Sequence, residues 1–340
     1  MKMKGCNYNE ILDYCIKKLK KNNNSIFYKE EMINIFLKAK KDTKHCIYFL
    51  ANIFYKRRLF MKLIFIRHAE PDYAKDSLTE KGFREAKLLA NRTKNWNVTQ
   101  FYCSPLGRAQ ATAMPTLEAH GVTLTTRFPD TAPDTICPPN PTKAIVYPWL
   151  RELHAPIEPQ IHPAGKQIPW DFTPEFLRDN PILFDQNHWA EAPIFKDCDI
   201  KAQYDWICGS LDKVLSQHGY ERDGLCYKTV SSTYTSNDFM MYDGNTIDHL
   251  KNAPRDEPVL VCFCHLGVMM TMLSHLINTS PYVMLHGFFT PPASVTIVSA
   301  EERILGHAYF RIQTLGDTSH LCSAAEPISY YGGFAAPFQL

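Results

Sequence analysis

An apolar stretch that ends in an arginine and a histidine is the first sign of chemistry in this sequence. Residues 63–66 have the pattern of a buried strand, and Arg67 and His68 follow it directly. A histidine nitrogen can attack phosphorus, and a neighbouring guanidinium can hold phosphoryl oxygens through parallel hydrogen bonds. The pair therefore suggests chemistry on a phosphate group.

A second cation is expected beyond the next strand. Residues 99–103 have the composition of a short strand that stops at Ser104 and Pro105, and a helix should begin near Arg108. The first turn of a helix presents free backbone amides, and a guanidinium there adds further donors for an oxyanion. This segment is thus suited to binding the same phosphate.

Two further apolar runs lead to residues that can exchange protons. Residues 258–264 lead to His265, and residues 144–147 are followed by Glu152. Because the carboxyl ends of parallel strands open onto one crevice in an α/β sheet, these residues can meet the first pair. Two histidines, two arginines and one glutamate would then surround one phosphoryl group.

With these pieces in this order, the chain resembles the histidine phosphatase superfamily, also called the phosphoglycerate-mutase-like family. The resemblance extends from Met61 to about Leu321. The segments that carry it are Arg67-His68-Ala69-Glu70, Leu78-Thr79-Glu80-Lys81-Gly82 with Ala86, Ser104-Pro105-Leu106-Gly107-Arg108-Ala109, Leu150-Arg151-Glu152, His265, and a C-terminal echo in Gly316-Asp317-Thr318-Ser319-His320-Leu321.

The resemblance implies a reaction through a phosphohistidine. His68 would be the nucleophile, with one ring nitrogen unprotonated and the other held by a hydrogen bond that fixes the tautomer. Arg67, Arg108 and His265 would bind the phosphate oxygens, and His265 would count among the catalytic residues. Glu152 would act as general acid and then as general base. No metal or other cofactor is implied.

These roles place opposite demands on two pKa values. His68 needs a low pKa so that it can attack, and the flanking arginines would help because like charges disfavour the cationic imidazole. Glu152 needs a raised pKa so that it can donate a proton, which calls for burial or a nearby dianion. Glu70 and Glu158 are alternative carboxylates for the same task.

Three positions depart from the family pattern. Ala69, Pro71 and Ala74 stand where members often have Gly, Thr or Ser, and Asn. These departures argue against a mutase, which must return the phosphoryl group to a re-oriented acid, whereas a phosphatase needs only water. We therefore favour a histidine phosphatase of the acid or broad-specificity type, acting on a small phosphorylated metabolite. A phosphoglycerate-type mutase and a non-catalytic protein that binds phosphorylated ligands remain the alternatives.

The first sixty residues differ from the rest in composition. They contain 14 of the 37 Lys and Arg and 5 of the 35 Asp and Glu, a net charge of +9, so the remainder carries −7 of the overall +2. They are rich in Lys and Asn, and all 23 prolines follow them. One interpretation is a helical appendage with helices near 8–19 and 30–39. The other is upstream sequence from a misassigned start, with the phosphatase domain spanning 61–340.

A segment rich in proline and aromatic residues interrupts this domain around 128–193. Frequent prolines rule out a single regular element, and the aromatic residues suggest packing against the body of the domain. We expect an inserted cap that controls access to His68, with a purely structural insertion as the alternative.

Cysteine spacing and hydrophobicity suggest a cytoplasmic protein. The 11 cysteines are irregularly spaced, which favours reduced thiols over a disulfide framework or a zinc site. The apolar run 47–54 is far shorter than a membrane span. The basic segment over residues 1–60 is most simply a solvated tail, so no nucleic-acid partner is expected.

The remaining patterns complete the predicted fold. Further elements are expected as helices over 200–218 and 266–277, a hairpin of 225–234 with 239–242, and closing strands over 294–299 and 308–313. The sequence thus predicts a three-layer α/β/α sandwich with a mostly parallel central sheet and an inserted cap.

Overall fold

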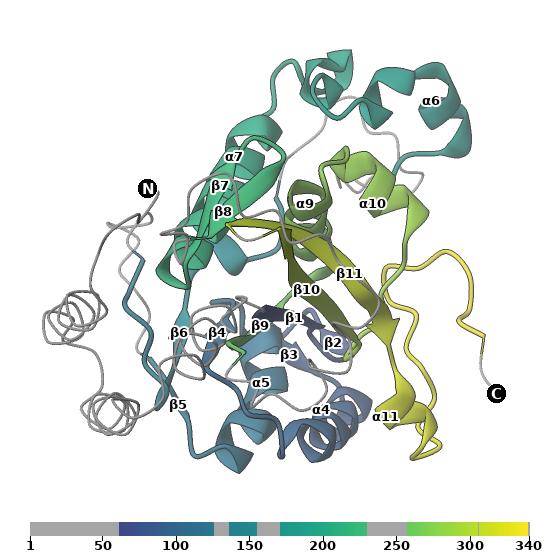
Figure 1. The fold of residues 1–340 in the computed structure, drawn as a ribbon. Helices are drawn as coiled ribbons and strands as arrows, with labels where there is room; N and C mark the ends of the chain where they lie inside the picture. The colour runs from purple at the N-terminus through teal and green to yellow at the C-terminus, as the bar shows by residue number, and fades with distance from the viewer. Residues whose placement is uncertain (1–60, 126–135, 155–170, 230–256, 305, 339–340) are drawn as a thin grey trace, which may run out of the picture. The chain divides into compact units, whose positions relative to one another are not determined.

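A nine-stranded sheet is the framework of the described chain (Figure 1). The computed structural model describes residues 61–125, 136–154, 171–229, 257–304 and 306–338. The strand order is β5-β6-β4-β9-β1-β10-β11-β8-β7. The basic extension over 1–60 lies outside the described residues. Within them, no helix combines the length and apolar character that crossing a membrane would require.

One half of the sheet is parallel and buried. Its strands are β1 (Met61–Arg67), β9 (Val259–Cys264), β4 (Gln100–Cys103), β6 (Lys143–Val146) and β5 (Thr123–Leu124). β1 pairs with β9, β9 with β4, β4 with β6, and β6 with β5, all in parallel. Near-continuous apolar runs are typical of parallel strands that are covered on both faces. The carboxyl ends of β1, β9, β4 and β6 consequently lie along one edge.

The other half of the sheet is antiparallel. It contains β10 (Val295–Ile304), β11 (His307–Asp317), β8 (Cys226–Thr229) and β7 (Tyr220–Asp223). β10 pairs antiparallel with β1 and β11, so β11 runs in the same direction as β1. The closing strands predicted at 294–299 and 308–313 are therefore confirmed, and both extend further than expected.

Helices cover both faces of the sheet. The α-helices are α4 (Glu80–Thr93), α5 (Gly107–Ala119), α6 (Pro174–Asp179), α7 (Ile200–Gln217), α9 (Leu266–Ile277), α10 (Pro281–Gly287) and α11 (Ser319–Cys322). The helices predicted over 200–218 and 266–277 correspond to α7 and α9. Figure 1 shows α4 and α5 on one side of β1 and α7, α9 and α10 on the other.

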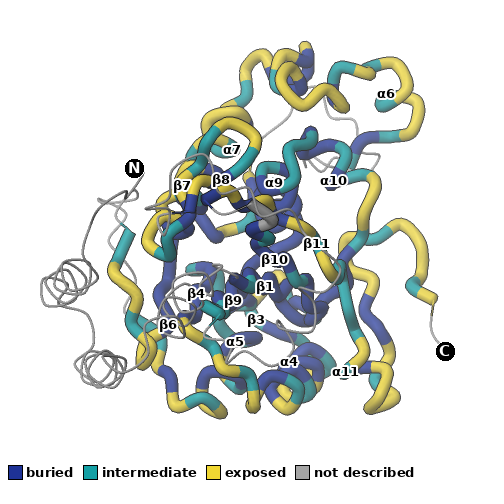
Figure 2. The backbone as a smooth tube through the Cα atoms, in the orientation of Figure 1, coloured by how far each residue is buried: buried dark blue, intermediate teal, exposed yellow. Residues whose placement is uncertain are grey.

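Alternate side chains of β1 confirm the three layers. Leu63 and Phe65 belong to the core cluster that includes α7 and α9, whereas Ile64 and Ile66 belong to the cluster that includes α4 and α5. Successive side chains of a strand point to opposite faces, so each face of the sheet has its own hydrophobic core. The central strands are buried throughout (Figure 2). The predicted sandwich with a mostly parallel sheet is confirmed.

The described part of the proline-rich segment is built from short helical turns. Besides α6, it contains the 3₁₀ turns η3 (Pro181–Phe184), η4 (Trp189–Glu191) and η5 (Pro193–Phe195). The rings of Phe172, Trp189 and Phe195 lie 5.5, 5.7 and 5.4 Å from the ring of Tyr282 in α10. Aromatic packing on α10 thus holds these turns against the body of the domain.

Part of the range 128–193 belongs to the sheet layer. β6 and the turn η2 (Pro148–Leu150) are buried in the core, and β6 pairs with β4. Residues 126–135 and 155–170 lie outside the described chain. Control of access to His68 by this segment stays a prediction.

The predicted hairpin has a different partner strand. β8 begins near the expected position, but it pairs with β7 across a turn at Gly224, whose φ is +60°. Glycine adopts this left-handed conformation without steric cost. The strand before the turn, residues 220–223, is absent from the prediction. The expected second strand, 239–242, lies outside the described residues.

Two glycines in helices are expected to respond differently to substitution by alanine. A Cβ at Gly82 in α4 would lie 2.3 Å from the carbonyl oxygen of Glu70, whereas nothing lies within 4 Å of a Cβ at Gly209 in α7. We expect Gly82→Ala to lower the free energy of unfolding by about 1–3 kcal/mol, because backbone must shift. Gly209→Ala should raise it by about 0.4–1 kcal/mol. Urea unfolding measures both, and equal effects would contradict the close approach of α4 to Glu70.

Candidate active site

The nucleophile candidate, His68, lies buried just beyond the end of β1. Its Nδ1 atom is 2.8 Å from the carbonyl oxygen of Ala69, which can only accept, so Nδ1 carries the proton. Nε2 is left with a lone pair. Burial lowers the pKa of His68 well below its ordinary value, and Arg67 and Arg108 lower it further. The expected low pKa is therefore present, with burial as its larger cause.

Arg67, the last residue of β1, is held by two backbone carbonyl groups. Nη1 donates to Thr290 O and Nη2 donates to Tyr331 O, each over 2.7 Å. The guanidinium also lies over the ring of Phe289, 5.9 Å from its centroid. Nε is buried and has no hydrogen-bond partner among the described residues. Arg67 is thus fixed in orientation while part of its donor set stays available.

Arg108, in the first turn of α5, is fixed by a carboxylate. Nη1 lies 2.7 Å from Oδ1 of Asp76, and the other oxygen of Asp76 accepts from the backbone N–H of Gly107 over 2.7 Å. The Arg108 guanidinium stacks over the ring of Tyr73 at 5.4 Å. Its Nε is buried without a partner within the described part of the chain. Asp76 was not predicted as a site residue, because nothing in its local sequence marks it.

His265 precedes α9 and is completely buried. Nε2 lies 2.7 Å from Oγ of Ser104, which also accepts from the backbone N–H of Leu106. In the tautomer in which the Ser104 hydroxyl donates to Nε2, the imidazole proton lies on Nδ1. Nδ1 has no partner among the described residues, and the ring centroid lies 5.1 Å from that of His68.

Glu152 follows η2, and two backbone amides hold its carboxyl group. Oε1 accepts from Leu153 N at 2.9 Å and from Val268 N at 3.1 Å. Burial raises the pKa of Glu152 despite these hydrogen bonds and the nearby Arg108 and Arg67. A raised pKa is what a proton donor requires. The structure thus places a carboxyl group of suitable character beside both arginines.

The alternative carboxylates fit the role of proton donor less well. Glu70 accepts hydrogen bonds from Ser329 and Thr79 and forms an ion pair with Lys81. Burial alone would raise the pKa of Glu70, but these hydrogen bonds outweigh it and lower the pKa. Such a carboxylate stays ionised. Glu158 lies outside the described residues.

Three buried nitrogen atoms near His68 thus lack a hydrogen-bond partner within the described residues. They are Arg67 Nε, Arg108 Nε and His265 Nδ1. Unpaired buried donors are costly unless a ligand satisfies them, and a tetrahedral oxyanion would accept from several at once. Across the described ranges, no group of three or more His, Cys, Asp or Glu side chains is placed to hold a metal ion. The donor set is therefore suited to binding an anion.

The comparison with known families agrees with this chemistry. Residues 63–128 match the model of the histidine phosphatase superfamily (branch 1), a range that includes Arg67, His68 and Arg108. The predicted resemblance to the histidine phosphatase superfamily is confirmed. Glu152 and His265 lie beyond the matched residues. No curated protein matches the chain.

Several solved structures align with most of the chain. The mycobacterial glucosyl-3-phosphoglycerate phosphatase with inorganic phosphate is 16% identical, with a TM-score of 0.45, over 76% of this chain and 99% of its own. Phosphoserine phosphatase from Entamoeba histolytica with 3-phosphoglyceric acid is also 16% identical, with a TM-score of 0.40, over 77% and 99%. YhfR of Bacillus stearothermophilus is 18% identical, with a TM-score of 0.40, over the same shares.

Ser104→Ala is expected to weaken phosphate binding by roughly tenfold, because His265 would lose the hydrogen bond that orients its free N–H. Isothermal titration with inorganic phosphate measures this. Ser210→Ala is the matched control, since Ser210 is equally buried and its hydroxyl has no partner among the described residues. Equal affinities in the two variants would contradict the role given to Ser104.

Proposed function

We propose that this protein is a metal-independent phosphomonoester hydrolase that acts on a small phosphorylated metabolite through a phosphohistidine. The observation that carries the proposal is the set of three buried nitrogen atoms without partners among the described residues, beside a histidine whose Nε2 is unprotonated. A pure binding site needs the donors alone. A nucleophilic nitrogen together with a carboxyl group of raised pKa supports a catalytic cycle.

In the first step, Nε2 of His68 attacks phosphorus and the bond from phosphorus to the leaving oxygen breaks. Arg67, Arg108 and His265 donate to the non-bridging oxygens, where negative charge lies in the transition state. Glu152 gives its proton to the leaving oxygen, so the alcohol departs neutral. The product of this step is phosphorylated His68 with an ionised Glu152.

In the second step, water replaces the histidine. The Glu152 carboxylate removes a proton from water as the oxygen attacks phosphorus, and the bond from phosphorus to Nε2 breaks. Inorganic phosphate is released, with His68 neutral and Glu152 protonated again. The fixed cations of the site supply the positive charge in both steps, so the proposal requires no metal ion.

We also propose a cytoplasmic location. The eight described cysteines are all free; four are buried, three are half-buried and one is exposed. Free thiols persist in reducing compartments, which supports this location.

His68→Ala is expected to abolish hydrolysis of p-nitrophenyl phosphate, with a loss of more than about 10³-fold in kcat, because no other group can carry the phosphoryl. EDTA should leave the wild-type rate unchanged. His188→Ala is the control, since His188 pairs with Asp185 in an exposed turn. Substantial turnover by His68→Ala would refute the proposal, and vanadate binding without any turnover by the wild type would favour a binding protein. Formation of an isomeric phosphoester would favour a mutase.

Glu152→Gln is expected to remove the high-pH limb of the rate profile. Activity should fall as pH drops through the lowered pKa of His68, because the imidazole becomes protonated, and should fall as pH rises through the raised pKa of Glu152, because the acid ionises. Glu152→Gln has no carboxyl group to ionise at this position, so only the fall at low pH should remain. Its kcat/KM, which reports formation of the phosphohistidine, should fall by about 10²-fold or more on alkyl phosphates and far less on p-nitrophenyl phosphate, whose leaving group needs no proton.

The matched control for this experiment is Glu191→Gln, a change at an exposed glutamate in η4. It should leave both the rates and the pH profile unchanged. Equal losses on alkyl and aryl substrates in Glu152→Gln would count against the assignment of Glu152 as the acid.

A further inference from the structure

One peptide group connects the nucleophile to a buried carboxylate. The carbonyl oxygen of Ala69 accepts from Nδ1 of His68 over 2.8 Å. The N–H on the other side of the same peptide, that of Glu70, donates to Oε2 of Glu85 over 2.8 Å. The resulting chain runs from imidazole to peptide to carboxylate without an intervening side chain.

The two neighbouring peptide groups are also held in place. The N–H of Ala69, in the preceding peptide, donates to Oγ1 of Thr112 over 2.9 Å, and Thr112 donates in turn to the carbonyl of Arg108. The carbonyl of Glu70, in the following peptide, is approached so closely by Gly82 of α4 that no side chain fits between them. The Ala69–Glu70 peptide therefore lies between two constrained neighbours.

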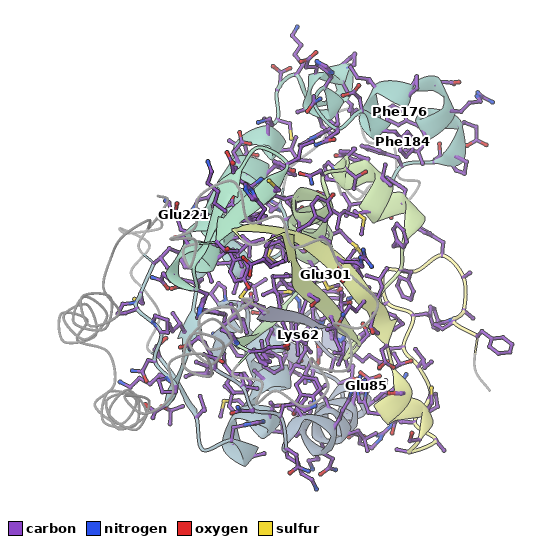
Figure 3. All side chains as sticks on the ribbon, in the orientation of Figure 1. Lys62, Glu85, Phe176, Phe184, Glu221 and Glu301 are labelled. Carbon is purple, nitrogen blue, oxygen red and sulfur yellow. The ribbon has the colours of Figure 1, made fainter. Side chains whose placement is uncertain are left out.

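Glu85 is an unusual residue for a purely structural contact. It lies on α4 and its side chain is fully buried (Figure 3). Its second oxygen, Oε1, has no hydrogen-bond partner in the described chain, and the nearest cation is Nζ of Lys81 at 3.8 Å. A buried carboxylate is costly, whereas a neutral amide oxygen could accept the same N–H at lower cost. The negative charge therefore calls for an explanation.

We propose that Glu85 is a positioning residue that acts on His68 through the Ala69–Glu70 peptide. Its negative charge polarises the peptide and makes the Ala69 carbonyl a stronger acceptor for the Nδ1 proton. A firmer hold on that proton fixes the tautomer and increases electron density at Nε2, the atom that attacks phosphorus. The Nδ1 proton stays on the imidazole throughout. The inference rests on the proposed function of His68 as nucleophile.

The charge on Glu85 depends on pH in the neutral range. Burial raises the pKa of Glu85 to about 7, although the hydrogen bond from Glu70 N and the cation of Lys81 oppose this. Several charged groups act on the Glu85 carboxyl group. The cations are Lys81 and Arg84 on α4 and Arg67 on β1, and the carboxylates are Glu70, three residues after β1, and Glu326 in the C-terminal segment. Above about pH 7 the carboxylate is ionised and polarises the peptide, and below that pH this effect is lost.

The decisive experiment compares kcat/KM of wild type and Glu85→Gln on p-nitrophenyl phosphate from about pH 5.5 to about pH 8.5. Glutamine keeps the acceptor and the shape but removes the charge. The wild-type to variant ratio should be about 1 at the acidic end. It should rise to roughly five- to tenfold at the alkaline end, because hydrogen bonds to charged groups are about twice as strong as neutral ones. Ionisation of Glu152 affects the wild type and Glu85→Gln alike, so its contribution to the pH profile cancels in the ratio.

Glu80→Gln provides the matched control, because Glu80 is exposed in the first turn of the same helix. Its ratio to wild type should stay flat with pH. Lys81→Met is the second test variant. It removes a cation that lowers the pKa of Glu85, so the rise in activity should move to higher pH. This shift is measurable even if Glu85→Gln folds poorly.

The possible failures can be told apart. If His68→Ala is inactive but the Glu85→Gln ratio is flat across the pH range, the role of Glu85 is overturned and the phosphohistidine proposal stands. A Lys81→Met profile that coincides with wild type would also overturn the role of Glu85. If His68→Ala retains activity, the proposed function itself fails. A structural role alone would lower the activity of Glu85→Gln equally at every pH.

Discussion

The site depends on keeping one imidazole neutral inside a cluster of positive charge. In the proposed mechanism Arg67 and Arg108 attract phosphate, and burial together with the same cations disfavours protonation of His68. The protein offsets the two guanidinium charges without placing a carboxylate against the nucleophile. Backbone carbonyls of Thr290 and Tyr331 hold Arg67, and Asp76 holds Arg108. The acceptor facing His68 is likewise a carbonyl, so the electron pair on Nε2 stays available.

The parallel half of the sheet brings these groups together. Arg67 ends β1, His265 follows β9 and Ser104 follows β4, and the three strands are neighbours. Residues separated by up to two hundred positions in the sequence therefore meet at one edge. The antiparallel half contributes differently, because β10 covers β1 and leads, through β11, to the C-terminal segment that contacts Arg67. The parallel half of the sheet thus positions the candidate phosphate-binding groups, and the segments before β10 and after β11 supply the carbonyl groups that hold Arg67.

Sequence reasoning succeeded where a residue type and a strand end coincide. Apolar runs that stop at Arg67, Ser104 and His265 located three strands and the candidate phosphate-binding residues at their ends, because buried parallel strands leave a strong pattern. It missed Asp76, Thr112 and Glu85, whose importance arises from single long-range hydrogen bonds with no periodic signal. The partner of β8 was also missed, since Tyr220–Asp223 is short and polar and only its turn glycine hints at a hairpin. The contacts of Thr290 and Tyr331 with Arg67 are made by backbone carbonyl groups. Every residue type has such a group, so the sequence does not indicate these contacts.

The bond between Arg67 and the carbonyl of Tyr331 spans 264 positions in the chain. During synthesis on the ribosome, the guanidinium therefore acquires its final orientation only after Tyr331 has emerged. All nine strands of the sheet precede this residue, so the sheet can form before Arg67 is held by both carbonyl groups. Removing Tyr331 would release the same arginine on one side, although Tyr331 is not among the groups proposed to touch the phosphoryl group.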